Sequence, residues 1–143
     1  MKLEDIFRAL NAAQVKYLLI GGVAIILYGV PRTSIDIDVA ISPSKANVKK
    51  TIDVLKKLGL TSDTEDVDDI LAQGGITFSN EREVDILTRL PSKDSFETLW
   101  ERRKKVTFKK VMINVVSKED QIRLLKRVGR RQDLEDAAVL ENR

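Results

Sequence analysis

The segment from Tyr17 to Ile41, YLLIGGVAIILYGVPRTSIDIDVAI, constrains the fold more than any other part of the chain. Its first apolar run predicts a β-strand that ends at Gly21-Gly22. The second predicts a short helix that ends before Pro31, because the residue before proline avoids the α-helical conformation. The alternating residues that follow predict a second strand. A glycine turn at a helix start exposes backbone N–H groups that bind phosphate well, so the turn predicts either a phosphate site or a plain tight connection.

Asp36 and Asp38 lie two residues apart in the second predicted strand, so their side chains point to the same face. The apolar residues at positions 35, 37, 39 and 41 point to the opposite, buried face. Two neighbouring carboxylates repel each other, which favours a cation site, and a plain solvent-facing strand surface is the alternative. A later predicted strand carries Glu83 and Asp85 on one face, so Asp85 is the candidate third carboxylate and Glu83 its substitute.

The rest of the chain alternates between helical and strand patterns. One helix is predicted to begin with Ser42 as N-cap and Pro43 as first residue and to end at Gly59, and residues 61–75 are predicted to form a loop with a helical turn around 67–71. Further helices are predicted at 2–14, 95–105, 118–128 and 132–140, and further strands at 76–79, 83–88 and 111–116. The predicted fold is α/β (α+β), with one domain over residues 1–143: a small mixed twisted sheet with packed helices, a core at about 1–90 and a C-terminal extension, mostly helical, at about 91–143.

Cysteine and histidine are both absent from the 143 residues, which excludes disulfides, zinc sites built on these residues, thiol nucleophiles and serine–histidine–aspartate catalysis. Chemistry therefore has to use carboxylates, lysine, arginine, hydroxyl groups or a hard metal ion. The net charge of +3 is too small to predict nucleic-acid binding, so the basic run from Arg102 to Lys110 indicates a solvated face before it indicates an RNA surface. The apolar segment 17–30 is shorter than the roughly 20 residues of a membrane-spanning helix, so no membrane association and a cytoplasmic location are expected.

The motifs together resemble the nucleotidyltransferase superfamily that includes DNA polymerase β. The resemblance rests on Gly21-Gly22, a short helix, the Arg32-Thr33 turn, Asp36-Ile37-Asp38 and Val84-Asp85-Ile86. The tail is similar to that of the small prokaryotic minimal nucleotidyltransferases and abortive-infection-type toxins, through Leu125-Lys126, Gly129-Arg130, Asp133 and Asp136. Two positions depart from the pattern: many members have serine at Gly22, and relatives of this branch often have histidine at Tyr28.

The resemblance implies an enzyme that moves a nucleotide from an NTP, with ATP as the expected donor, to a hydroxyl on protein or RNA, within a toxin–antitoxin system. It implies that Asp36, Asp38 and Asp85 are catalytic and hold one or two Mg²⁺ ions, for which Mn²⁺ could substitute. It also implies nucleotide binding by Gly21, Gly22, Arg32 and Lys126. Arg32 could instead cap its turn, and a non-catalytic nucleotide- or partner-binding protein of the same fold is the alternative function.

Overall fold

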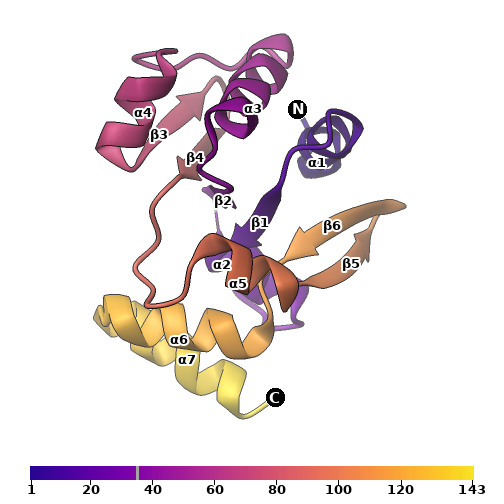
Figure 1. Cartoon of the computed structure of the whole chain (residues 1–143). Helices are drawn as coiled ribbons and strands as arrows, with labels where there is room; N and C mark the ends of the chain where they lie inside the picture. The colour runs from indigo at the N-terminus through magenta and orange to yellow at the C-terminus, as the bar shows by residue number, and fades with distance from the viewer. Residues whose placement is uncertain (35) are drawn as a thin grey trace.

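The computed structural model, which describes residues 1–34 and 36–143, contains one mixed β-sheet covered by helices (Figure 1). Its strands are β1 (Tyr17–Ile20), β2 (Ile37–Ile41), β3 (Gly75–Ser79), β4 (Glu83–Leu87), β5 (Lys104–Phe108) and β6 (Val111–Val115). Its helices are α1 (Leu3–Ala12), α2 (Gly21–Leu27), α3 (Lys45–Lys57), α4 (Val67–Gln73), α5 (Phe96–Glu101), α6 (Lys118–Val128) and α7 (Arg131–Glu141). The predicted α/β class with a small mixed sheet is confirmed.

The strand order β3-β4-β2-β1-β6-β5 places β2 in the middle of the sheet. β2 pairs with β1 in antiparallel orientation, which sets Ile20 opposite Asp38. It pairs with β4 in parallel orientation, which sets Asp38 opposite Asp85. The glycine turn that follows β1 and the acidic residue of β4 therefore lie on either side of Asp38.

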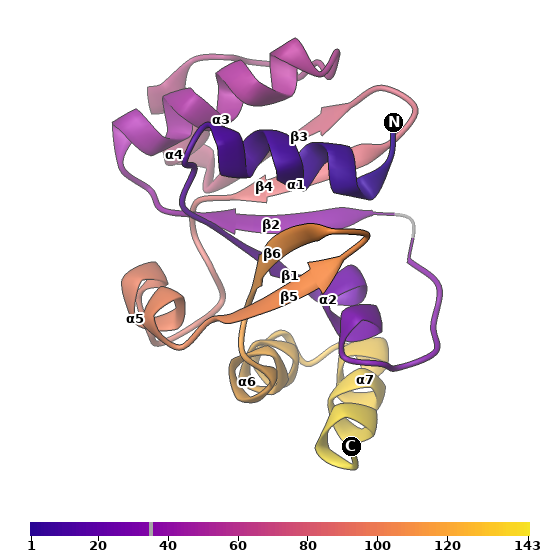
Figure 2. The ribbon, with the colours of Figure 1, turned by 90° about the vertical axis from the view of Figure 1, so that its right-hand side faces the viewer.

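The two faces of the sheet bury different residues because side chains alternate along β2. Ile37, Val39 and Ile41 are buried in the core on the face of α1 and α3, as predicted, whereas position 35 lies outside the described residues. Ala40 is buried on the opposite face, with apolar residues of α5 and α6, and α7 packs against α6 and α2. Figure 2 shows α6 and α7 at the end of the molecule opposite α3 and α4. No helix within residues 1–34 and 36–143 is both long enough and apolar enough to cross a membrane.

The helix predicted to begin at Ser42-Pro43 begins two residues later. Ser44 is its N-cap, and the Ser44 Oγ accepts a hydrogen bond from the backbone N–H of Asn47 at 3.2 Å. Of the two serines in Ser42-Pro43-Ser44, the second is the N-cap, and not the first as predicted. The predicted helical turn within residues 61–75 extends to the whole of α4, which ends at Gly74 in the left-handed conformation.

The helix predicted over 95–105 is wrong in its second half. It ends at Glu101, and β5 follows it and pairs with β6 in antiparallel orientation. The connecting residues Lys109 and Lys110 have positive φ angles of 48° and 68°, a conformation that asparagine and glycine adopt more readily than lysine. The usual sequence signal of a hairpin is therefore missing at this turn, and a run of lysine and arginine residues is compatible with a helix as well.

Candidate active site

Asp38 and Asp85 form a carboxylate pair across two neighbouring strands. They are register partners in β2 and β4, and their side chains emerge on the sheet face that carries α5 and α6. Burial, followed by the negative charge of Asp85 and then that of Asp36, raises the pKa of Asp38 to about 6, and only Arg130 acts in the opposite direction. Negative charge is therefore concentrated here, and a bound cation would relieve the repulsion.

The donor set at this pair suits a hard metal ion. Asp36 lies directly before β2, and not within the strand as predicted, so its carboxylate is at the exposed rim of the pair. The hydroxyl of Thr77 in β3 donates to Oδ1 of Asp85 and orients that carboxylate. In the described part of the chain no three carboxylates converge into a metal-binding cluster. Carboxylate oxygens are the ligands that Mg²⁺ prefers when it completes its shell with water and substrate phosphates, so the residues present fit such an ion.

Gly21 brings the backbone into contact with Asp38. Its φ angle is +73°, and a Cβ atom placed on it would overlap the Oδ2 atom of Asp38. Only glycine combines this left-handed conformation with this close approach. The turn therefore begins α2 directly against the acidic pair.

We expect Gly21→Ala to weaken nucleotide binding at least about tenfold, because the new methyl group overlaps the Asp38 carboxylate and displaces it from its position between the glycine turn and Asp85. Gly59→Ala is the matched control: Gly59 also has a positive φ angle, +88°, but a Cβ atom there would meet nothing within 4 Å. Calorimetry with an NTP and Mg²⁺ measures the difference. Equal affinities in the two variants would contradict this role for Gly21.

Gly22 leaves room for the hydroxyl of Ser34. A Cβ atom on Gly22 would lie 2.6 Å from Ser34 Oγ and 3.5 Å from Arg32 Nη1. A serine at position 22, as many superfamily members have, would therefore collide with Ser34 in this arrangement. Ser34 brings a hydroxyl to the turn from the loop before β2. Ser34 could not be identified from the sequence, because a single serine in a loop carries no spacing signal.

Two arginines at the turn are each held by a buried aspartate of α7. Arg32 Nη1 lies 2.6 Å from Asp136 Oδ2, and Arg130 Nε lies 2.8 Å from Asp133 Oδ2. Both aspartates are only 6% exposed, so each fixes the position of a more exposed guanidinium group. These contacts give Asp133 and Asp136, which belong to the tail motif, the role of positioning the two arginines.

Lys126 lies apart from this group. Its Nζ is 2.7 Å from Glu141 Oε1, and Lys126 does not line the cavities around Asp38. Arg130 lines two of these cavities and acts electrostatically on Asp38, although the sequence analysis gave it no binding role. The signal that could have found it is its position directly after Gly129, where the chain turns from α6 into α7.

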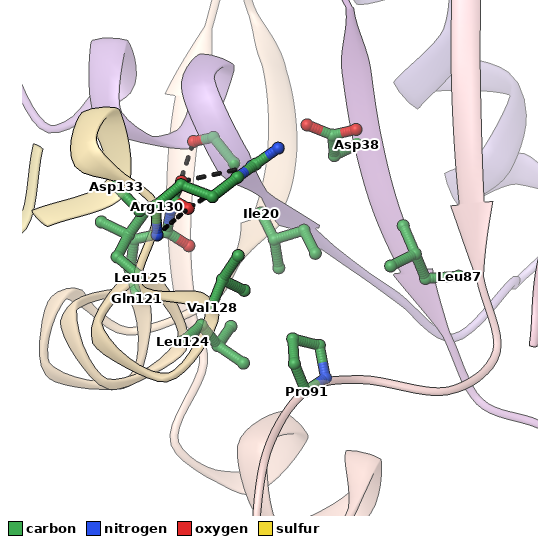
Figure 3. A pocket seen from close by; sticks show the side chains of 11 residues that line it. Ile20, Asp38, Leu87, Pro91, Gln121, Leu124, Leu125, Val128, Arg130 and Asp133 are labelled. Carbon is green, nitrogen blue, oxygen red and sulfur yellow. Dashed lines mark hydrogen bonds and ion pairs between the residues drawn. The ribbon is translucent and has the colours of Figure 1, made fainter.

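Three cavities meet at Asp38. We call them the polar cavity, about 320 Å³, the apolar cavity, about 200 Å³, and the edge groove, about 420 Å³. The polar cavity is lined by the glycine turn, both arginines, Ser34 and Asp36, and the edge groove by Asp85, Thr77 and the start of β3. Figure 3 shows the apolar cavity between the strands that carry Asp38 and Leu87 and the α6 residues Gln121, Leu124 and Val128. One carboxylate thus borders three spaces of different chemistry.

Solved structures with the same fold support a comparison over the whole chain. A lincosamide antibiotic adenylyltransferase, LnuA, with lincomycin bound is 21% identical, with a TM-score of 0.68, and the match covers 99% of this chain and 96% of that one. A proposed nucleotidyltransferase from Thermotoga maritima is 17% identical, with a TM-score of 0.67 and coverage of 98% and 90%. The antibiotic-resistance factor ANT(2'')-Ia in complex with adenylyl-2''-tobramycin is 14% identical, with a TM-score of 0.63 and coverage of 94% and 82%. At these identities the likeness shows a shared fold.

No curated protein matches the sequence significantly. The sequence model of one protein family, described as uncharacterised nucleotidyltransferase, matches residues 1–125. That range contains β1, the glycine turn, Asp36, Asp38 and Asp85, and it ends within α6. The chain therefore belongs to this family of nucleotidyltransferases.

Proposed function

We propose that the chain transfers a nucleotide from an NTP, with ATP as the expected donor, to a hydroxyl group in a Mg²⁺-dependent reaction in the cytoplasm. The observation that carries the proposal is the position of Asp38, beside Asp85, against the Gly21 turn and at the junction of the three cavities. A donor nucleotide that spans the polar and apolar cavities would have its reacting phosphate beside Asp38, and an acceptor in the edge groove would approach from the side of Asp85.

The polar cavity suits a triphosphate. Gly21 and Gly22 offer backbone N–H groups at the start of α2, and Ser34 adds a hydroxyl. Arg32 and Arg130, held by their aspartates, bring positive charge to the same cavity. Two positioned guanidinium groups stabilise the charge that develops on the phosphates during transfer.

At the α-phosphorus, the reaction we propose forms one bond and breaks one. The acceptor oxygen bonds to the α-phosphorus of the NTP, the bond from that phosphorus to the β-phosphate oxygen breaks, and pyrophosphate leaves. Asp85 accepts the hydroxyl proton, because it borders the edge groove and its carboxylate is oriented by Thr77. Asp36, Asp38 and Asp85 would hold one or two Mg²⁺ ions, with Mn²⁺ as a substitute. When bound, the metal polarises the phosphate oxygens and lowers the pKa of the acceptor hydroxyl.

A hydroxyl on protein or RNA is the proposed acceptor, and a cognate toxin or antitoxin protein is the proposed partner. Support for both comes from the resemblance to minimal nucleotidyltransferases and abortive-infection toxins. A small hydroxylated molecule is the second candidate acceptor. It is supported by the two structural neighbours described as bound to lincomycin and to adenylyl-2''-tobramycin.

The experiment that tests the function incubates the protein with NTPs labelled at the α-phosphate, Mg²⁺ and cell extract. We expect label on a macromolecule, and its loss on protease or nuclease treatment identifies the acceptor. A failure of labelling in reactions that contain EDTA supports the metal requirement. A parallel assay with lincosamides and aminoglycosides tests the small-molecule acceptor. Nucleotide binding without transfer in every assay would indicate the non-catalytic alternative.

We expect Arg130→Gln to weaken NTP binding by about tenfold or more, because a positioned guanidinium group is lost from the polar cavity. Lys126→Gln tests the residue that the sequence favoured, and it should change the affinity by less than about twofold because Lys126 pairs with Glu141 away from the cavity. Titration with a fluorescent NTP analogue measures both. A larger loss in Lys126→Gln than in Arg130→Gln would return the phosphate-binding role to Lys126.

A further inference from the structure

Gln121 of α6 has a buried amide oxygen without a partner. The residue is 1% exposed, and its Nε2 donates to the backbone carbonyl of Gly21 at 3.3 Å. Since a carbonyl can only accept, this hydrogen bond fixes which end of the amide is the nitrogen. Among the side chains of residues 1–34 and 36–143, Oε1 of Gln121 is the buried polar atom that has no hydrogen-bond partner. A buried acceptor left unpaired is destabilising, so a donor from outside the chain is expected to pair with it.

The ligand that would supply this donor enters the apolar cavity, whose wall includes Gln121. Figure 3 shows Gln121 on the helix side of this cavity, with Leu124, Leu125 and Val128. Its other walls are Ile20, Leu87 and Pro91, so an apolar or flat group is favoured over most of the surface. The charged residues of this cavity, Asp38, Arg130 and Asp133, also line the polar cavity, so the two cavities meet there.

We infer, on the basis of the proposed function, that Oε1 of Gln121 accepts a hydrogen bond from a ribose hydroxyl of the donor nucleotide and makes the enzyme select ribonucleotides. The ribose is bonded directly to the α-phosphate, and the base lies one unit farther away. Gln121 is hydrogen-bonded to Gly21, and Gly21 touches the Asp38 carboxylate. The side-chain amide of Gln121 is therefore separated by one residue, Gly21, from the carboxylate beside which we place the reacting phosphate. The base then occupies the apolar end of the cavity, toward Leu87 and Pro91.

The test compares the dissociation constants of ATP, 2'-deoxy-ATP and 3'-deoxy-ATP, measured by calorimetry with Mg²⁺. The wild-type protein should bind ATP about tenfold or more tightly than one of the deoxy analogues, because that analogue leaves Oε1 unpaired. In Gln121→Met, which keeps the volume but removes the acceptor, the ratio should fall to within about twofold. Glu119→Gln, an exposed position on the same helix that lines none of the three cavities, should keep the wild-type ratio.

The outcomes separate this inference from the function on which it rests. Equal affinity of the wild-type protein for all three nucleotides overturns the ribose contact and leaves the proposed function intact. A Gln121→Met variant that binds all three more weakly by the same factor also overturns it, since Gln121 would then only hold Gly21 in place. If no NTP binds to the wild-type protein, the proposed function itself is contradicted.

Discussion

Replacing Asp38 with asparagine is expected to reduce nucleotidyl transfer by roughly 10³-fold or more and to remove Mg²⁺-dependent NTP binding. Among the residues that the structure describes, Asp38 alone borders the polar cavity, the apolar cavity and the edge groove. It is also the register partner of Asp85, so its loss disrupts the metal-binding pair and the contact with the donor phosphate together. Asp68→Asn, a substitution of the same kind at a carboxylate that is 74% exposed, pairs with Lys45 and lines none of the three cavities, should leave transfer unchanged.

The same substitution is expected to stabilise the metal-free protein at neutral pH. The pKa of Asp38 is raised from 3.8 to about 6, so between these two values the folded state binds more protons than the unfolded state. The contribution of Asp38 to stability therefore falls as the pH rises from 3.8 to about 6 and stays lower above that range. With a discount for partial exposure to solvent, the gain in Asp38→Asn above this range is of the order of 1–2 kcal/mol, and it should vanish below pH 3.8.

Chemical denaturation at several pH values, with and without Mg²⁺, measures both consequences. Mg²⁺ should stabilise the wild-type protein, because the ion binds the folded state, and should leave Asp38→Asn unaffected. A variant that is less stable than the wild-type protein at neutral pH without metal would mean that the carboxylate has a structural partner. Unchanged NTP affinity in the variant would remove Asp38 from the binding site.

Elements whose two ends carry local signals could be predicted from the sequence. β1 was predicted with the bounds Tyr17–Ile20, because an apolar run stops at two glycines. α6 was predicted between Ser117 and Gly129, and in the structure Ser117 Oγ accepts from the N–H of Asp120 and Gly129 has a φ angle of +71°. In both cases the residues that end the element do so through their own backbone preferences.

Features that depend on distant contacts could not be predicted. β5 is a strand because β6 pairs with it, and its turn of two lysines gives no hairpin signal. The pairing of Lys126 with Glu141, which holds Lys126 away from the polar cavity, does not follow from sequence spacing, whereas Arg130 and Asp133 are three residues apart, a spacing that allows contact at the start of a helix. Likewise, Arg32 and Asp136 are 104 residues apart in the sequence, and only the packing of α7 beside the glycine turn brings them together.

Asp85→Asn is expected to separate transfer from binding. A bound NTP and its metal can be held by Asp36, Asp38 and the polar cavity, so the variant should keep most of its nucleotide affinity. Transfer also requires the acceptor hydroxyl to be aligned and deprotonated, and Asp85 lies at the edge groove with its carboxylate oriented by Thr77. We therefore expect transfer of labelled nucleotide to fall by about 10²-fold or more, the scale of losing a positioned catalytic group.

The comparison with Glu83→Gln shows whether transfer requires a carboxylate at the position of Asp85 or only a negative charge somewhere in β4. Glu83 shares the strand and the face of Asp85, but it is exposed at the start of β4, its register partner is Ser79 of β3, and it does not line the edge groove. Only Asp85 is registered with Asp38, so Glu83→Gln should retain transfer while Asp85→Asn loses it. Full transfer in Asp85→Asn together with loss in Glu83→Gln would assign the third carboxylate to Glu83. Full transfer in both variants would mean that the acceptor proton leaves without a carboxylate of β4, and that Asp36 and Asp38 are enough to hold the metal.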